Sequence, residues 1–407
     1  MTDVVYVLGA GFNKSIVSGE DVELQPPTAL DLFKLILSSE HFRKHRASIA
    51  SSHPIDVLLG LIAKYFHLSE QELLEKGVDI EAVMTLFEQQ EWDAETQEIY
   101  EVAQQGASAL RVLLTDYLAD VSIACSGLPR GIRFGLRVLE EQADVLTFNY
   151  DSVAEDAIAL ASGLVGVDSR DELPGDLKGL DRDSTYERLL KLSQLPWKIS
   201  LASGFKFDRL TVPVAEGVGT QDGTDYYAES DHELYDSRRV LKLHGSINWW
   251  KPSENRWMGR SRKDNDINPA LRASVESQIH WLTGANPTSG SWIEDPVIVP
   301  PMLYKVFDEL PLPEVWSEAR SSLSSCRKLV VIGYSFPPTD FRTKRLFLES
   351  FCDVSNLKEV IVVNPSIEAA EVVSELSHLG RDPLRFEDLE EYFRNQSRLQ
   401  DPTVQQI

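Results

Sequence analysis

Six short apolar segments recur along this chain, each bounded by turn-forming or polar residues. They are rich in valine, isoleucine and leucine without polar alternation, and they span residues 4–8, 145–148, 240–243, 297–299, 329–332 and 360–363. Such continuous apolar runs are typical of strands buried on both faces, as in a parallel sheet covered by helices. Helical patterns follow two of them, at residues 154–160 and 368–379. The alternation predicts an α/β protein with a doubly wound, mostly parallel sheet.

The uneven spacing of these segments indicates inserted regions. Helical periodicity recurs between the first two predicted strands, at residues 29–37, 54–65, 80–89 and 94–118, which predicts a large α-helical insertion. A second region is rich in aspartate, glycine and serine and holds a possible strand at residues 210–214. We therefore predict a sheet core of residues 1–27, 143–162 and 239–380, a helical insertion of residues 28–142, a second insertion of residues 163–238, and a C-terminal helix and tail of residues 381–407.

Cysteine content and charge exclude several classes of function. The chain has 3 cysteines, Cys125, Cys326 and Cys352. They exclude a four-cysteine zinc site and a disulfide framework within one chain, so we expect no metal and a reduced, cytoplasmic setting. No apolar run is long enough to span a membrane, and the N-terminus lacks a signal pattern. The net charge of −24 argues against a chain that coats nucleic acid by itself.

A glycine motif, Gly9-Ala10-Gly11, directly follows the first predicted strand. A strand that ends in Gly-x-Gly is typical of a Rossmann-like fold, where the glycines permit a tight turn and a close approach of the backbone to a pyrophosphate. Lys14 replaces the usual third glycine, and Asn13 stands where a Walker loop needs glycine. Taken alone, an ordinary glycine turn explains this motif equally well.

Polar residues also follow the second predicted strand, as Asn149-Tyr150-Asp151. Ligands of open α/β sheets bind at the carboxyl ends of the strands, which is where these side chains are expected. The alternative is helix capping, because Asp151 or Ser152 precedes a helix expected to begin near Val153. Capping accounts for one of these residues and leaves the cluster of amide, phenol and carboxylate unexplained.

Three further strand ends carry small or polar groups. His244 follows the third strand, Gly333 and Ser335 follow the strand at 329–332, and Asn364 follows the strand at 360–363. Each is commonplace when taken singly, and a lone histidine is more often structural than catalytic.

Together, these strand ends carry Gly-Ala-Gly, Asn-Tyr-Asp, His-Gly-Ser, Gly-Tyr-Ser and Val-Asn, in that order. The series resembles the sirtuin superfamily, whose motifs are Gly-Ala-Gly-x-Ser, Gln-Asn-x-Asp, His-Gly, Gly-Thr-Ser and an Ile-Asn strand end. The resemblance covers the sheet core and not the inserted regions. It implies a protein that binds NAD and has Asn149 and His244 as its catalytic pair. The residues that it places around NAD are Gly9, Ala10, Gly11 and Asn13 at the pyrophosphate loop, Tyr150 and Asp151 in the nicotinamide pocket, Gly333 and Ser335 along the phosphate and adenosine side, and Asn364 at the adenosine ribose.

The departures from the family narrow the expected activity. Deacylase sirtuins carry a four-cysteine zinc ribbon and a Gly-Ile-Pro-Asp-Phe-Arg stretch, and this chain has too few cysteines and reads Gln-Pro-Pro-Thr-Ala at residues 25–29. What remains resembles the sirtuin-like domains of bacterial antiviral defence systems, which hydrolyse NAD. This implies an NAD hydrolase that acts in antiphage defence by depleting NAD, with NAD as its substrate and no metal.

The chemistry of NAD cleavage fits these residue types. The nicotinamide–ribose bond breaks through an oxocarbenium-like centre and releases neutral nicotinamide, so no strong general acid is needed. The amide oxygen of Asn149 can hold the attacking water. His244 can accept a proton from that water or a ribose hydroxyl, and Asp151 can accept a hydrogen bond from the carboxamide.

Two other functions remain open: a residual deacylase or ADP-ribosyltransferase, and a non-catalytic NAD or ADP-ribose binding module that regulates a partner. An enzyme that consumes NAD must be inactive until it is triggered, so we expect control by a homo-oligomer or by a separate protein. A DNA-translocating ATPase of the HerA type is such a partner by analogy alone. We expect no direct contact with nucleic acid or a membrane.

Overall fold

Seven strands form one parallel sheet in the computed structural model of the chain. The structure describes residues 2–22, 24–39, 54–125, 127–164, 200–202, 237–252, 258–259, 293–298, 312–337, 340–352, 356–377 and 382–399. The strand order is β10-β9-β8-β1-β2-β4-β3, and every neighbouring pair is parallel. The strands are β1 (Val4–Leu8), β2 (Asp144–Thr147), β3 (Ser200–Ala202), β4 (Ser237–Lys242), β8 (Lys328–Ile332), β9 (Glu359–Val363) and β10 (Leu384–Phe386). The predicted α/β fold with a mostly parallel, Rossmann-like sheet is confirmed.

The strand order reverses at β1, which is the topological switch point of the sheet. The strands β2, β4 and β3 lie on one side of β1, whereas β8, β9 and β10 lie on the other. The chain therefore adds strands first on one side of β1 and later on the other side. The crevice at such a switch point, beyond the carboxyl ends of the strands, is where open α/β sheets bind ligands.

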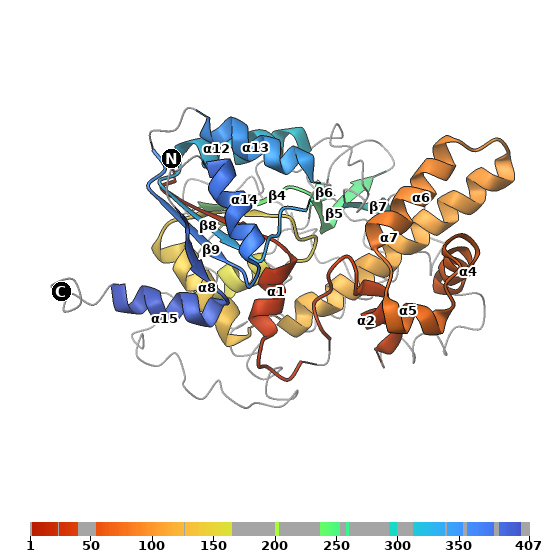
Figure 1. Ribbon diagram of the computed structural model, residues 1–407, viewed down its shortest axis with the longest axis horizontal. Helices are drawn as coiled ribbons and strands as arrows, with labels where there is room; N and C mark the ends of the chain where they lie inside the picture. The colour runs from red at the N-terminus through yellow and green to blue at the C-terminus, as the bar shows by residue number, and fades with distance from the viewer. Residues whose placement is uncertain are drawn as a thin grey trace, which may run out of the picture.

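Helices cover both faces of this sheet, which explains why its strands are apolar throughout. Tyr6 and Leu8 of β1 belong to one buried cluster and Val5 and Val7 to another, because successive side chains point to opposite faces. The first cluster joins α1 (Ala10–Val17), α8 (Pro129–Glu140), α9 (Val153–Leu164) and α15 (Leu389–Leu399). The second joins α12 (Leu312–Ser325), α13 (Phe341–Phe351) and α14 (Ile367–Ser377). In Figure 1, α12 and α13 lie above the sheet.

A group of helices between β1 and β2 extends away from the sheet (Figure 1). It comprises α2 (Leu32–Ser38), α4 (Pro54–Phe66), α5 (Glu70–Lys76), α6 (Ile80–Trp92) and α7 (Gln97–Cys125). The long helix α7 packs against α4 and α6 at its outer part and against α1 near the sheet. The helical insertion predicted from the sequence is therefore present as packed helices.

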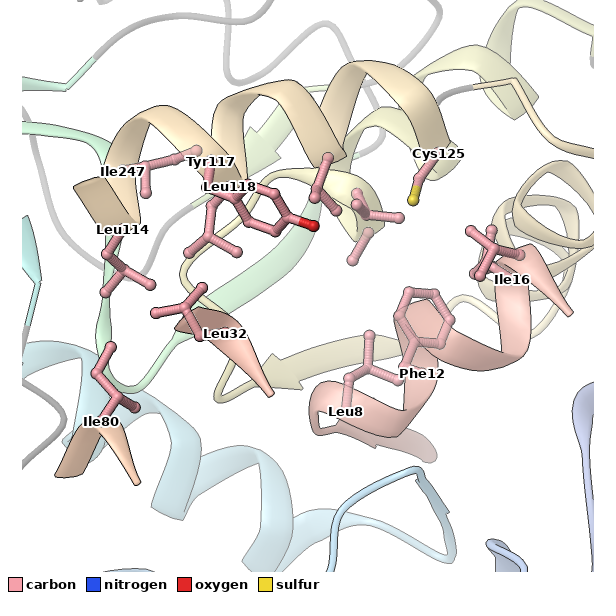
Figure 2. Close-up of a cluster of buried hydrophobic side chains, with 14 of the residues drawn as sticks. Leu8, Phe12, Ile16, Leu32, Ile80, Leu114, Tyr117, Leu118, Cys125 and Ile247 are labelled. Atoms are coloured by element: carbon pink, nitrogen blue, oxygen red, sulfur yellow. The ribbon is translucent and has the colours of Figure 1, made fainter. Parts of the chain in front are cut away.

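The insertion shares one hydrophobic core with the sheet. In Figure 2, Tyr117 and Leu118 of α7 lie in the same cluster as Leu8 of β1 and Phe12 of α1. The Tyr117 hydroxyl also donates a hydrogen bond of 2.9 Å to the carbonyl oxygen of Gln25. These contacts fix the insertion against the loop that follows α1.

Three sequence predictions need correction or fall outside the described residues. The segment at 297–299 was expected in the parallel sheet, but β7 (Ile293–Ile298) pairs antiparallel with β5 (Gly245–Pro252) in a second sheet of order β6-β5-β7, where β6 is Met258–Gly259. Pro296 fits this position, because β7 is an edge strand and proline lacks an amide donor. The strand β10 follows residue 381, where only a helix and tail were expected. The possible strand at 210–214 lies outside the described residues.

The cysteines of the structure are free thiols. Cys125 and Cys326 are buried and Cys352 is exposed. Among the described residues, none of the helices has the length and apolar character that crossing a bilayer requires.

Candidate functional site

The parallel strands bring the five predicted strand ends to one edge of the sheet. Thr147 of β2 pairs with Lys242 of β4. Asn149 and His244 each lie two residues beyond this pair. They therefore occupy equivalent positions beyond the ends of neighbouring strands. This edge, next to the switch point at β1, is the candidate site.

Three glycines hold the loops after β1 and β8 in direct backbone contact. The amide of Gly9 donates to the Ile332 carbonyl at 3.0 Å, and the amide of Gly11 donates to the Gly333 carbonyl at 2.9 Å. A Cβ on Gly9 would lie 2.7 Å from the Gly333 oxygen, and one on Gly11 would lie 2.7 Å from the Gly333 Cα. The glycines are therefore needed for packing between the two loops, and the Gly11 amide already has a protein acceptor.

A chain of hydrogen bonds connects the first loop to the second. The Nδ2 of Asn149 donates to the Gly9 carbonyl at 3.1 Å and to Oδ1 of Asn13 at 3.4 Å. The Nδ2 of the buried Asn13 donates in turn to Oδ2 of Asp151 at 2.6 Å. Because both acceptors of Asn149 are oxygens, they fix which end of its amide carries the nitrogen. The position of Asn149 thus depends on Asn13 and Asp151.

The side chain of Asp151 also bonds the first amide of α9, the helix that begins two residues later at Val153, as the capping interpretation expects. Its Oδ1 accepts a hydrogen bond of 3.1 Å from the amide of Val153. Burial raises the pKa of Asp151 above its ordinary value, and the nearby charge of Lys242 opposes that rise. One carboxylate therefore caps α9 and orients Asn13.

A buried ion pair lies behind this loop. Lys242 is 2% exposed, and its Nζ lies 3.2 Å from Oε1 of Glu155. The same ammonium donates to the main-chain carbonyl oxygen of Asp151. Lys242 therefore ties the end of β4 to the loop after β2, which keeps the Asn149 and His244 segments adjacent.

His244 is 5% exposed and lies among aromatic rings and one carboxylate. The ring of Phe148 meets it edge to face at a centroid distance of 5.0 Å, and the Tyr150 ring lies at 6.2 Å. Its Nε2 is 3.6 Å from Oδ2 of Asp340, which is 2% exposed. The imidazole is thus held in a largely apolar setting beside a buried acid.

Tyr150 lies between His244 and the helical insertion. Burial raises the pKa of its phenol, and the charges on Glu81 and Asp340 raise it further. Glu81 belongs to the first turn of α6, so the insertion contributes a carboxylate near this edge of the sheet. The Tyr150 carbonyl accepts a hydrogen bond of 3.0 Å from the amide of Ile247.

The strand ends assigned to the adenosine side differ in their exposure. Ser335 is exposed after β8, whereas the amide of Asn364 after β9 is buried. The Nδ2 of Asn364 donates to the Tyr334 carbonyl at 3.2 Å, and its Oδ1 accepts from the amide of Ser366 at 2.9 Å. The side chain of Asn364 therefore already supports the loop that contains Tyr334.

Two charged residues at this edge were not recognised from the sequence. Lys242 lies inside an apolar strand, where a lysine gives no sign of its partner Glu155. Asp340 precedes a helix and looks like an ordinary N-cap. In the part of the chain that the structure describes, no three histidine, cysteine, aspartate or glutamate side chains converge as a metal site would require.

No protein-family model matches the chain, and no curated protein matches it either. Among solved structures, a Sir2 homologue in complex with NAD has 11% identity and a TM-score of 0.35, with 92% of this chain and 87% of that chain covered. A Sir2 complex with a p53 peptide and NAD+ has 12% identity and a TM-score of 0.35, with 97% and 92% covered. The fold is therefore assigned from the strand order of this chain and not from these similarities.

Proposed function

We propose that this protein is an NAD hydrolase that releases nicotinamide and ADP-ribose. The observation that carries the proposal is the placement of Asn149 and His244 at equivalent positions, two residues beyond the paired ends of β2 and β4. The pair lies at the carboxyl edge where such sheets bind ligands, next to the glycine loop after β1. An amide and an imidazole that follow neighbouring strands at this edge provide a water-holding group and a proton acceptor.

In this proposal Asn149 holds the attacking water. Its Nδ2 is committed to the Gly9 carbonyl and to Asn13, so its Oδ1 is the atom that accepts from water. The hydrogen-bonded chain through Asn13 and Asp151 keeps that oxygen in one place. A reactant held in a fixed position avoids much of the entropic cost of a bimolecular step.

His244 accepts the proton that the water or a ribose hydroxyl loses. Its low exposure favours this role, because water is excluded from a centre where charge develops. Among the residues that the structure describes, the carboxylate of Asp151 accepts one hydrogen bond at each oxygen, from Asn13 and from Val153. Each oxygen retains a second lone pair, so a bond from the nicotinamide carboxamide remains available.

Two alternatives differ in what they require. A deacylase or ADP-ribosyltransferase would use the same atoms and would need an acylated or acceptor peptide beside them. A binding module that regulates a partner would retain NAD without breaking it. The presence of both Asn149 and His244 favours catalysis over binding alone, and the lack of four cysteines disfavours the peptide groove of the deacylases.

We expect the purified chain to convert NAD to equal amounts of nicotinamide and ADP-ribose without any peptide. The measurement is the quantity of both products with NAD alone and with an acyl-lysine peptide added. Nicotinamide release that depends strictly on the peptide would support the deacylase alternative. Retention of NAD without either product would support the binding module.

The proposed biological role is antiphage defence by depletion of cytoplasmic NAD, and such an enzyme must be held inactive before infection. The helical insertion supports control by assembly, because its helices extend beyond the sheet core (Figure 1). The net charge of −24 disfavours self-association at low salt, since like charges repel within a Debye length of ~10 Å at 0.1 M salt. Assembly then needs apolar contact or a partner with a basic surface, such as a DNA-translocating ATPase.

We expect NAD turnover per molecule to change with protein concentration or with addition of such a partner. Light scattering gives the mass of the pure chain, and a dilution series gives the turnover at each mass. A chain that stays monomeric, with constant turnover at every dilution and with the ATPase present, would rule out control by assembly.

A further inference from the structure

The carboxylate of Asp340 is used in an unexpected way for a residue at the start of a helix. Asp340 occupies the N-cap of α13, where aspartate normally accepts a hydrogen bond from the first turn. Its side chain makes no such capping bond to the described residues of α13. The Tyr334 hydroxyl instead donates to Oδ2 of Asp340, and the same oxygen faces His244.

This arrangement places a buried acid beside a buried base. The two side chains are 6% and 2% exposed, and 3.6 Å separates Nε2 of His244 from Oδ2 of Asp340. Burying a carboxylate is costly unless a partner of opposite charge or a donor compensates. The hydroxyl of Tyr334 is one donor, and His244 provides the opposite charge once its imidazole has taken up a second proton.

The described groups that face His244 from the neighbouring elements include two phenols, one carboxylate of α6 and an ion pair. Tyr150 and Tyr334 present phenols whose pKa values are raised by burial, so both are neutral near pH 7. The carboxylate of Glu81 acts on both phenols from α6. On the strand side, the ammonium of Lys242 is paired with Glu155.

We propose that Asp340 is a positioning residue for His244: its carboxylate holds the proton on Nε2 and leaves Nδ1 as the atom that accepts a proton. The tautomer of a histidine is set by the partner of its other nitrogen. When Nδ1 takes a proton from water or a ribose hydroxyl, the imidazolium forms beside the Asp340 carboxylate, which stabilises it. Such contacts are often long before substrate binds and shorten in the reacting complex. The catalytic consequence rests on the proposed function, whereas the pairing itself does not.

The test is the pKa of His244, measured by NMR titration of the full chain with labelled histidine. The His244 signal is identified by its loss in His244→Asn. We expect Asp340→Asn to lower this pKa by about 1–3 units, because an opposite charge within ~4–6 Å contributes a shift of that size. The matched control is Asp144→Asn, which removes another buried carboxylate at the opposite end of β2, paired with Arg239, and should leave the His244 pKa unchanged.

A second variant tests the pairing if Asp340→Asn does not fold. Tyr334→Phe removes the hydroxyl that shares Oδ2 and leaves the charge in place, so the pKa of His244 should stay or rise. An unchanged His244 pKa in Asp340→Asn, or a lowered one in Tyr334→Phe, would overturn the pairing. If wild type cleaves NAD, the acidic limb of its pH–rate profile should move down in Asp340→Asn by the same amount as the NMR value. A wild type without turnover but with the predicted NMR shifts would overturn the proposed function and not the pairing.

Discussion

Alanine in place of Asn149 should remove at least ~99% of NAD turnover, because the loss of a group that positions or transfers a proton costs ~10²–10⁴-fold. The same loss is expected for His244→Ala. Neither change should prevent folding, since both residues lie beyond the strand ends rather than within the sheet. The measurement is nicotinamide release at saturating NAD, together with a thermal unfolding curve for each variant.

Two control variants separate a catalytic role from general damage. Asn395→Ala removes an amide on α15 whose Nδ2 donates a hydrogen bond of 2.9 Å to the Glu391 carbonyl of the same helix. His67→Asn changes an exposed histidine in the helical insertion. Both should retain turnover close to that of wild type. Near-normal turnover in Asn149→Ala or His244→Ala would show that its assigned role is wrong, and a collapse in melting temperature would favour a structural role.

The largest effect on stability should come from Gly333→Ala. Gly333 has a φ of +62°, and a Cβ there would lie 2.2 Å from both the Gly11 carbonyl carbon and the Phe12 nitrogen. A residue other than glycine in this backbone region costs ~1–2 kcal/mol, and overpacking costs a further ~1–3 kcal/mol. The neighbouring atoms are backbone and cannot move aside as a side chain can. We expect the free energy of unfolding in urea to fall by about 2–5 kcal/mol.

Two other glycines provide matched controls for this substitution. Gly19 has a φ of +74° and only the Arg130 Nη2 near a Cβ, at 3.9 Å, so Gly19→Ala should show the backbone cost of ~1–2 kcal/mol alone. Gly60 lies in α4, and no atom of the described residues would lie within 4 Å of a Cβ there, so Gly60→Ala should stabilise the helix by ~0.5–1 kcal/mol. A loss for Gly333→Ala no larger than that for Gly19→Ala would contradict the close contact between the two loops.

The sheet core was predictable because its strands leave a strong pattern. Strands such as β1 and β8 are buried on both faces, which forces runs of valine, isoleucine and leucine that no helix or turn explains better. The polar residues that follow these runs then fall at one edge once the strands are parallel. For this reason Asn149 and His244 could be placed together without knowledge of any side-chain contact.

Elements whose local sequence conflicts with their packing were missed. The helix α8 contains Gly131 and Gly135, which read as interruptions of a helix. In the structure a Cβ on Gly135 would lie 2.2 Å from the Ala157 carbonyl oxygen, so the glycine is required for close packing of α8 on α9. The strand β10 is only three residues long, which is too short for periodicity to reveal.

The charged contacts of the site also could not be predicted from the sequence. The pairing of Lys242 with Glu155, and of Asp340 with His244, joins residues that are distant along the chain. Nothing in the local sequence distinguishes Asp340 from a helix cap. The partner of Asp340 is set by the packing of α13 against α12, which in turn packs against β4, and this is a property of the tertiary structure.

The most direct test of the central claim is the balance of products formed by the purified chain from NAD alone. The site proposed here predicts nicotinamide and ADP-ribose in a ratio of about one to one, since hydrolysis of one bond yields one of each. Formation of both should be abolished in Asn149→Ala and retained in Asn395→Ala. The absence of ADP-ribose from wild type under every condition of concentration and partner, or its undiminished release by Asn149→Ala, would contradict the account.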